Sequence, residues 1–434
     1  MNVFPCALTN INADKREERQ RAKIGDRIYK YSDDGSSALE FNVSGERFRV
    51  NRNLLEMLPE STLGNFYKRE VYFDAKRNER IEEWGMATLP DMPERIQRYL
   101  IRAHLKWWSL RLQAGGNVEK QHEYKAKMVK IFRENEKIAE ATEEAKEQHY
   151  EVPTEFFKLS LGRWLKYSSC YWPRGCDSLN DAEVAMLEKI CERAQIKDGQ
   201  HVLDLGCGWG SCGLYLLKKY PNIHVTFFSN SRTQQEHIRN EAKKGGNLNR
   251  IRSITGDVNV VDVVDENGKT IEFDRIVTNE MFEHMKNYDR LFEKVSKWLK
   301  PETGLLFIHV FCHRNFPYQF KVKKSNNADW MAKNYFTGGS MPSFDTFLFF
   351  QRNLRIQNTW MMNGTHYSKT LEAWLQLMKD KKAEISSIFA KEYGPKEVQK
   401  QLNNWKLFYI MSSEAFAYNK GNDWCVAHYT FKRN

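Results

Sequence analysis

The sequence predicts an α/β protein whose core is a doubly wound, mostly parallel sheet. Short apolar runs, typical of buried strands, alternate with helical segments through the second half of the 434-residue chain. The first of these runs ends in Gly206, Gly208 and Gly210, immediately before a helical segment. Glycines at such a turn let a ligand approach the backbone closely. We therefore expect a ligand site at the first strand–helix turn of the sheet.

The bulk composition restricts the function classes. The net charge is +11, but the 67 basic residues are mixed with 56 acidic ones along the chain, so we expect no nucleic-acid partner. The eight cysteines form no C-x-x-C pair, which favours reduced thiols and a cytoplasmic location. No apolar run reaches 18 residues, so neither a membrane span nor membrane association is expected.

The N-terminal part divides into a polar tail, residues 1–37, expected to be flexible, and a small α+β appendage, residues 38–85. The appendage should hold short strands around 40–43 and 46–50, a turn at Ser44-Gly45 and a helix from Asn51 to Met57. The stretches "FNVSGERFRVNRNLLEMLPESTLGN" and "VYFDAKRNE" resemble the first half of the BTB-like tetramerisation domain of voltage-gated potassium channels. That resemblance implies a homo-oligomer. The other interpretation is a hairpin with no role in assembly.

The remaining chain divides into a helical lid and a catalytic-type domain. Residues 86–150 have apolar residues at three- and four-residue spacing after Pro93 and then a long charged helix that Pro153 should end. Residues 151–434 hold the sheet, with an aromatic-rich substrate cap at about 315–420. The expected strands are 201–206, 224–230, 274–280 and 304–310, with a last one at 424–433, and the expected helices are 211–220, 232–244 and 289–300.

The stretch "VLDLGCGWG", residues 202–210, has the pattern D-x-G-x-G-x-G. It resembles motif I of class I S-adenosylmethionine-dependent methyltransferases, whose fold is a Rossmann-like doubly wound sheet. The resemblance implies S-adenosylmethionine as the cofactor, with its methionine end at Asp204, Gly206 and Gly208. The alternative is a glycine-rich turn that holds no ligand.

Two later strand ends should complete the cofactor site. The second strand ends in "FFSNSRTQQEHI", which has no carboxylate for the ribose hydroxyls, so the amides of Asn230 and Gln234 are expected to bind them. Asp257, in the stretch "ITGDVNVVD", follows a further predicted strand between those at 224–230 and 274–280, where an acid commonly accepts from the adenine amino group, with Val258 beside it. Ser168 is expected near the cofactor. No metal is implied.

Several longer stretches resemble the coclaurine N-methyltransferase family, whose members are relatives of cyclopropane fatty acid synthases. They include "HYEVPTEFFKLSLGRWLKYSSCYWP", "NEMFEHMKNY", "NYFTGGSMPS", "NGTHYSKTLEAWL" and "FAYNKGNDWCVAHYTF". The resemblance covers about residues 93–431. It implies methyl transfer to the nitrogen of a small, aromatic or hydrophobic, alkaloid-like amine.

The cluster E-x-x-E-H at Glu280, Glu283 and His284 is where that family has its substrate pocket. Carboxylates beside an imidazole can hold an ammonium group by charge-assisted hydrogen bonds and take its proton. Crowded carboxylates also raise one another's pKa. The other interpretation is that these residues only cap the following helix. Aromatic faces suit a cationic or flat amine, and the residues in matching family segments are Tyr150, Trp330, Tyr335, Phe336, His366 and Tyr367.

Two other functions are open. One is carbon methylation or cyclopropanation of lipid acyl chains. The synthases resembled have a cysteine before their Tyr-Trp pair and a glycine two residues before Phe-Glu-His, and this chain has Ser169 and Glu280 there, with Cys170 one place later. The other is an oligomeric assembly protein that keeps a vestigial methyltransferase fold. The intact glycine loop and acidic cluster favour the enzyme.

Overall fold

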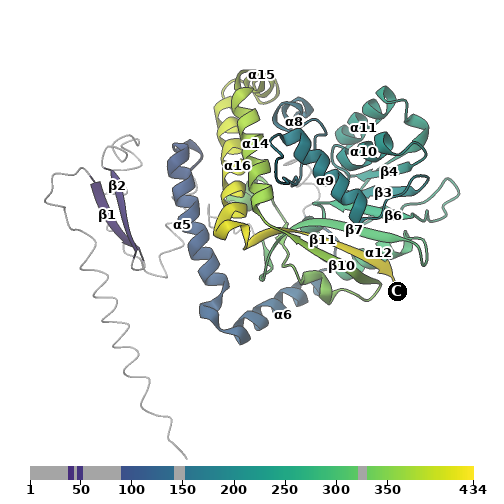
Figure 1. The fold of residues 1–434 in the computed structure, drawn as a ribbon, viewed down its shortest axis with the longest axis horizontal. Coiled ribbons are helices and arrows are strands. Elements are labelled where there is room, and N and C mark those ends of the chain that lie inside the picture. Colours follow the sequence, from purple (N-terminus) through teal and green to yellow (C-terminus); the bar gives the residue numbers. More distant parts are fainter. Residues whose placement is uncertain (1–37, 44–45, 52–88, 141–151, 321–329) are drawn as a thin grey trace, which may run out of the picture. The chain divides into compact units, whose positions relative to one another are not determined.

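The computed structural model describes residues 38–43, 46–51, 89–140, 152–320 and 330–434 (Figure 1). The chain separates into two compact units, Met1–Glu82 and Glu83–Asn434. In the first unit, β1 (Ala38–Val43) pairs antiparallel with β2 (Glu46–Asn51). This confirms the two predicted strands of the appendage. The predicted tail, and the predicted helix beyond Asn51, lie outside the described residues, while Asn51 itself ends β2.

A seven-stranded sheet forms the centre of the second unit, in the order β10-β11-β7-β6-β3-β4-β5. Its strands are β3 (His201–Leu205), β4 (His224–Ser229), β5 (Ile251–Thr255), β6 (Arg275–Asn279), β7 (Leu305–His313), β10 (Leu354–Met362) and β11 (Trp424–Arg433). The five strands from β3 to β7 are parallel, whereas β11 runs antiparallel to both β7 and β10. The predicted doubly wound sheet is confirmed.

Helices cover both faces of this sheet (Figure 1). They include α9 (Leu179–Arg193), α10 (Ser211–Lys219), α11 (Arg232–Lys244) and α12 (Tyr288–Lys297). Successive strand residues point to opposite faces. Val202 therefore packs in a core with α9 and α10, while Leu203 packs in a second core with α12. Burial on both faces explains why these strands read as continuous apolar runs.

The boundaries of the first two long helices of the second unit differ from the prediction. These helices are α5 (Glu94–Leu112) and α6 (Val118–Glu134). The chain breaks between them at Gly115, whose φ of 65° is left-handed, and Asn117 caps α6 by accepting from the Lys120 amide. The prediction of a helix continuing to residue 148 is wrong over 135–140, because α6 ends at Glu134. The rest of that stretch lies outside the described residues.

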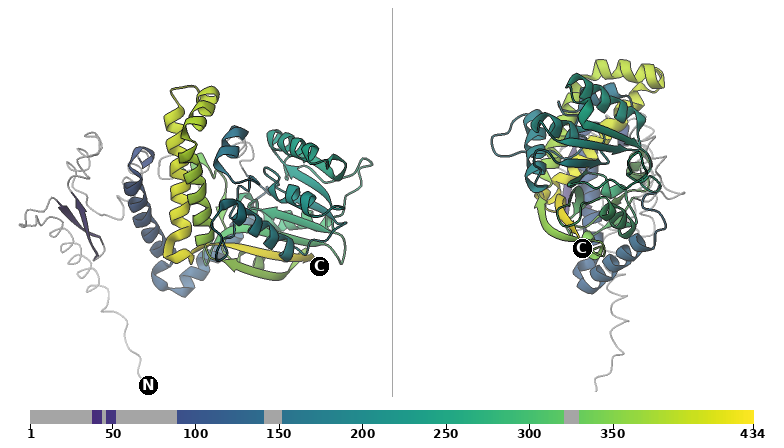
Figure 2. Two further views of the ribbon diagram at one scale, coloured as in Figure 1. Left: turned by 45° about the horizontal axis from the view of Figure 1, so that its top comes forward. Right: turned by 90° about the vertical axis from the view of Figure 1, so that its right-hand side faces the viewer.

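The C-terminal helices stand beside the sheet domain (Figure 2). They are α14 (Thr365–Asp380), α15 (Lys382–Tyr393) and α16 (Val398–Gly421). Shorter elements are α8 (Thr154–Ser160), α13 (Trp330–Asn334), β8 (Tyr318–Gln319) and β9 (Ser340–Met341), with 3-10 turns at Leu89–Asp91, Ala114–Gly116, Leu248–Arg250, Phe282–His284 and Thr346–Phe349. Within the segment predicted as the substrate cap, about 315–420, Leu354–Met362 forms β10, an edge strand of the sheet.

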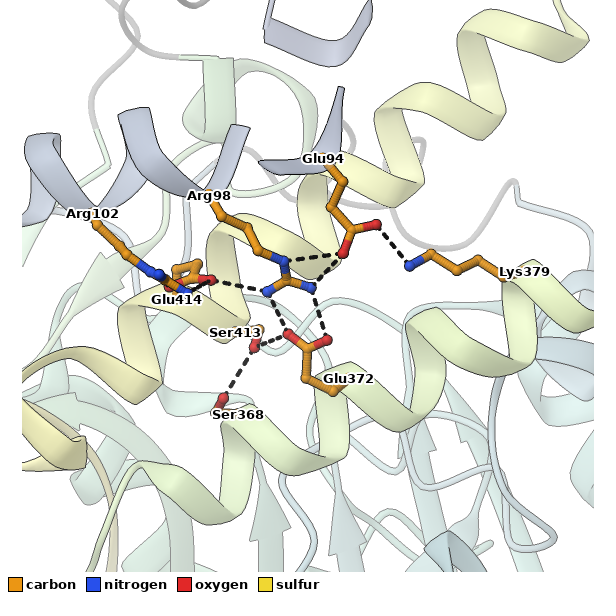
Figure 3. Close-up of polar contacts among 8 residues, drawn as sticks. All are labelled: Glu94, Arg98, Arg102, Ser368, Glu372, Lys379, Ser413 and Glu414. Atoms are coloured by element: carbon orange, nitrogen blue, oxygen red, sulfur yellow. Dashed lines mark hydrogen bonds and ion pairs between the residues drawn. The ribbon is translucent and has the colours of Figure 1, made fainter. Parts of the chain in front are cut away.

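An ion-pair network fixes α5 to α14 and α16 (Figure 3). The Arg98 guanidinium donates to Glu94 of its own helix, to Glu372 of α14 and to Glu414 of α16. Glu414 is only 5% exposed and also accepts from Arg102 at 2.6 Å. Because these partners belong to three helices, the network sets where α5 lies against the C-terminal helices.

Among the helices in the described part of the chain, none combines the length and apolar composition needed to cross a bilayer.

The seven cysteines in that part are free thiols, and six of them are buried.

Candidate active site

The loops at the carboxyl ends of the parallel strands bring the predicted residues together. Asp204 lies near the end of β3, Glu280 directly follows β6, and Glu283 and His284 lie in the 3-10 turn after it. Since β3 and β6 are neighbours in the sheet, the glycine loop and the acidic cluster lie side by side. This edge is where open α/β sheets bind ligands.

The glycine loop after β3 has the backbone that its sequence predicts. Gly206 and Gly208 have φ values of 74° and 52°, in the left-handed region that favours glycine. A Cβ on Gly206 would lie 2.7 Å from Cγ of Met281, the neighbour of Glu280. A Cβ on Gly208 would meet no atom of the structure within 4 Å, among the residues described. Gly206 therefore allows contact with the acidic loop, and Gly208 leaves room for a ligand.

The Asp204 side chain stabilises this glycine loop through a hydrogen bond. It is 1% exposed and accepts a 2.9 Å hydrogen bond from the Gly213 amide, in the first turn of α10. Burial raises its pKa to about 7, and the Gly213 bond opposes that rise. The carboxylate thus joins the end of β3 to the start of α10 and holds the glycine loop between them.

The residues predicted for the ribose and adenine follow β4 and β5. Asn230 is half-buried, and Gln234 is 3% exposed, with its Oε1 accepting from the Ser229 hydroxyl at 2.8 Å. No described protein atom accepts a hydrogen bond from the Gln234 Nε2, so that amide group keeps its donors. Asp257 accepts from the backbone and side chain of Asn259, and Val258 is buried.

This arrangement fits S-adenosylmethionine. Open space at Gly208 admits the methionine end, and the amide of Gln234 can donate to a ribose hydroxyl. The half-buried Asp257 offers carboxylate oxygens for an adenine amino group. The predicted Ser168 is 5% exposed, and its hydroxyl accepts from the ammonium group of Lys166 at 2.6 Å.

Glu280 is the most constrained side chain of the site. Its φ is 51°, unusual for a residue with a side chain. Its Oε1 accepts from the Ser169 amide at 2.9 Å and contacts Nε2 of His309 at 3.1 Å, and its Oε2 accepts from the Tyr367 hydroxyl at 2.6 Å. Burial raises its pKa to about 7, and the charge of Lys166 and the hydrogen bonds from Ser169 and Tyr367 limit the rise.

Glu283 is buried in a different way. Its side chain is fully buried, and neither carboxyl oxygen has a hydrogen-bond partner among the described residues. Burial is the larger cause, and the charge of Glu280 the smaller one, that raise the pKa of Glu283 well above its usual range. An unpaired carboxylate in such a position would be very costly. Burial therefore favours the neutral form of Glu283 more strongly than that of Glu280.

His284, the third member of the cluster, lies half-buried and stacks on Phe336, with ring centroids 5.8 Å apart and planes 11° apart. Of the other predicted aromatics, Tyr367 contacts Glu280 itself. His366 instead accepts at Nδ1 from the Trp172 amide at 3.1 Å. The stacking places Phe336 beside the acidic loop, as a pocket wall requires.

Two of the three remaining predicted aromatic residues lie in the described part of the chain. Tyr335 is 4% exposed and stacks on Phe408 with centroids 4.4 Å apart, so it belongs to the packed core. Trp330 is half-buried against Tyr335. Tyr150 lies outside the described residues.

Sequence reasoning missed several polar residues around Glu280. Lys166 is 1% exposed and donates to the Ser168 hydroxyl and the Ser169 carbonyl, both at 2.6 Å. His309 and His428 are fully buried on neighbouring strands, with Nδ1 of the first 2.8 Å from Nε2 of the second. The available signal was a histidine inside each of two apolar strand runs, "LLFIHVFCH" and "WCVAHYTF".

The chain is similar to known methyltransferases over most of its length. A family model described as mycolic acid cyclopropane synthetase matches residues 137–424. (S)-coclaurine N-methyltransferase of Thalictrum flavum subsp. glaucum is 39% identical over 68% of this chain and 81% of that relative. Pavine N-methyltransferase of the same plant is 34% identical over 78% of this chain and 91% of its own length.

A solved structure of coclaurine N-methyltransferase bound to N-methylheliamine and SAH has a TM-score of 0.74 and 36% sequence identity, covering 80% of this chain and 98% of that one. With this fold and this glycine loop, the protein is a class I S-adenosylmethionine-dependent methyltransferase. The chain belongs to the mycolic acid cyclopropane synthetase family, among the homologues of coclaurine N-methyltransferase. The comparisons give no support to the potassium-channel resemblance of the N-terminal segment.

Proposed function

We propose that this enzyme methylates the nitrogen of a small, aromatic or hydrophobic amine, with Glu280 as the proton acceptor. The observation that carries the proposal is the Glu280 carboxylate, buried beside the glycine loop with a pKa of about 7 and held by Ser169, His309 and Tyr367. The relatives named above are alkaloid N-methyltransferases, which supports an amine of that class.

Methyl transfer needs a free lone pair on nitrogen, whereas an amine in water at pH 7 is mostly an ammonium ion. Bound S-adenosylmethionine supplies an electrophilic methyl carbon on a positively charged sulfur. Glu280 can bind the ammonium N–H and accept its proton. The nitrogen lone pair then forms the N–C bond while the C–S electrons return to sulfur. Buried surroundings strengthen each of these electrostatic steps.

The two glutamates can divide the work. Glu280 is fixed by Ser169, His309 and Tyr367, so its carboxylate is already oriented. Glu283 lacks such partners among the described residues, so its carboxyl can turn toward an ammonium group. An arriving cation lowers the pKa of both groups. The same site would be a poor one for a neutral acyl chain, since that substrate gives these carboxyls no partner.

A labelled-methyl assay tests the proposal. Purified protein receives methyl-labelled S-adenosylmethionine together with either a panel of arylalkylamines or phospholipid vesicles. We expect label on an amine, and a loss of about 100-fold or more in the Glu280→Gln/Glu283→Gln variant. Glu188→Gln, an exposed glutamate of α9, is the control and should retain activity. Label on lipid, or amine methylation that survives the double substitution, would refute the proposal.

The role of the N-terminal segment is a separate question. We propose that residues 1–85 are dispensable for methyl transfer, because the site described above lies wholly in the second unit. Comparing the full chain with residues 86–434 by light scattering tests the predicted assembly role of the segment. A change in oligomer size would support that role, and an unchanged size would end it.

A further inference from the structure

Four side chains form a continuous chain of hydrogen bonds from the last turn of α9 to the proposed base. Arg193 Nη1 lies 2.7 Å from His428 Nδ1, and His428 Nε2 lies 2.8 Å from His309 Nδ1. His309 Nε2 lies 3.1 Å from Oε1 of Glu280. The two histidines face each other across the antiparallel pair of β7 and β11. The proposed function uses only Glu280 and the contact of His309 with it, and gives no role to His428 or Arg193.

The charge of Arg193 fixes the direction of every bond in the chain. A guanidinium has donors and no acceptor, so Nδ1 of His428 must accept. Burial and nearby positive charges lower the pKa of both histidines well below the usual range, so each ring carries a single proton. His428 therefore has its proton on Nε2 and donates to Nδ1 of His309. His309 in turn has its proton on Nε2 and donates to Glu280.

This chain cannot carry protons away from the site. A proton leaving Glu280 along it would have to end on Arg193, which has no lone pair to receive it. The chain instead presents a fixed N–H to one carboxylate oxygen. A donor of this kind favours the charged form of a carboxylate.

We propose that Arg193, acting through the tautomers of His428 and His309, is a positioning residue that keeps the Glu280 carboxylate charged and ready to accept a proton. Without Arg193, His428 can move its proton to Nδ1. His309 would then donate from Nδ1 to His428, and its Nε2 lone pair would face Oε1 of Glu280. A lone pair on His309 Nε2 that faces a lone pair on Glu280 Oε1 repels it. The contact therefore favours the protonated Glu280 carboxyl, which cannot accept a proton.

Other charged groups also act on this chain. The charge of Lys166 acts on Glu280 and on both histidines, and that of Lys189 acts on His428. Glu283 and Glu280 act on each other, and Glu192 and Tyr171 act on Arg193. Arg193 also lies over the Trp360 ring of β10, 4.8 Å from its centroid. Lys189 is on the same helix as Arg193 and affects His428 through charge alone. It therefore provides a control that separates charge from hydrogen-bond direction.

The first test is the pH profile of kcat/KM and rests on the proposed function. In Arg193→Met, the acidic limb should move up by about one pH unit, because Glu280 stays protonated to higher pH. Arg193→Lys keeps a donor without a lone pair and should restore the limb. Lys189→Met removes a neighbouring charge and should move it much less. An unchanged limb in Arg193→Met, or an equal shift in Lys189→Met, would overturn the inference.

The second test needs no substrate and separates this inference from the proposed function. Nitrogen NMR of ¹⁵N-histidine protein reports which ring nitrogen is protonated, with His309→Gln and His428→Gln assigning the signals. The wild type should show both rings neutral with the proton on Nε2. In Arg193→Met, the proton of His309 should move to Nδ1. A wild-type protein with Nδ1 protonated in either ring would overturn the inference, even if amine methylation is established.

Discussion

The Tyr367 hydroxyl donates a 2.6 Å hydrogen bond to Oε2 of Glu280, across 87 positions of sequence. Tyr367 lies in the first turns of α14, whereas Glu280 follows β6. This bond ties the C-terminal helices to the edge of the sheet at the proposed base. Oε2 of Glu280 is thus held by Tyr367 of helix α14, and Oε1 is held by His309 of strand β7.

Glu280→Gly should produce an enzyme that a small carboxylate can rescue. Glycine accepts the φ of 51° without strain, so the loop should keep its shape. The variant should lose activity by about 10²–10⁴-fold, as expected for a general base. Added formate can occupy the space between the donors from Ser169, His309 and Tyr367, and should restore part of the rate.

Glu280→Gln is the matched control for that rescue. Its amide fills the same space and cannot accept a proton, so formate should have no effect. The measurement is the methyl-transfer rate of each variant as a function of formate concentration. Equal responses of the two variants would show that formate does not act at this position.

Gly208→Ala should weaken cofactor binding more than it weakens the fold. An alanine at φ 52° is strained by about 1 kcal/mol, and its Cβ would enter the space assigned to the cofactor. Gly199→Ala is the control, since Gly199 has a φ of 77° and equally open surroundings in a turn before β3. Calorimetry should show a raised Kd for S-adenosylmethionine in the first variant alone. Equal Kd values would place the cofactor elsewhere.

The contribution of Glu280 to the stability of the ligand-free protein should fall as the pH rises toward neutrality. Burial raises the pKa of Glu280 from 4.5 to about 7, so the folded state binds this proton more tightly than the unfolded state does. Its contribution is complete below pH 4.5 and is lost as the pH rises through 7. Glu280→Gln should remove part of that slope, on the order of 1–3 kcal/mol. Denaturant unfolding at pH 5 and pH 8 measures the free energy of unfolding of the wild type and the variant. An equal change in both proteins between the two pH values would contradict the raised pKa of Glu280.

Arg98→Met should loosen the attachment of α5. Its loss leaves Glu414, 5% exposed, with Arg102 as its only remaining partner among the described residues (Figure 3). We expect a cost of about 1–3 kcal/mol, because a buried carboxylate loses one charged donor. Lys130→Met, which breaks an exposed pair with Glu134, should cost much less. Thermal unfolding of both variants checks this, and equal melting temperatures would show that the network adds nothing.

The sequence predicted the parallel part of the sheet well, because strands buried on both faces and amphipathic helices leave clear patterns. The break at Gly115 and the end of α6 at Glu134 were missed, since charged residues continue past both points with helical spacing. The edge strand Leu354–Met362 was hidden inside the predicted cap, because most of its side chains are at least partly exposed and it lacks a buried-strand pattern.

The acidic cluster could be found from the sequence because its members are adjacent. The groups that hold Glu280 could not, because they come from three separate segments. Lys166 and Ser169 lie in one loop before the sheet, His309 is in β7, and Tyr367 is in α14. Only the strand register and the packing of α14 bring them together, and neither can be read from local periodicity.

Strand β11, the last strand of the described chain, lies inside the sheet between β7 and β10. During synthesis, β10 emerges about sixty residues before its sheet partner, so it must wait unpaired. Pairings so far apart in sequence form slowly and expose strand edges meanwhile. His309 also meets His428 only when β11 inserts. The hydrogen-bonded pair of histidines next to Glu280 can therefore form only after β11 has been synthesised.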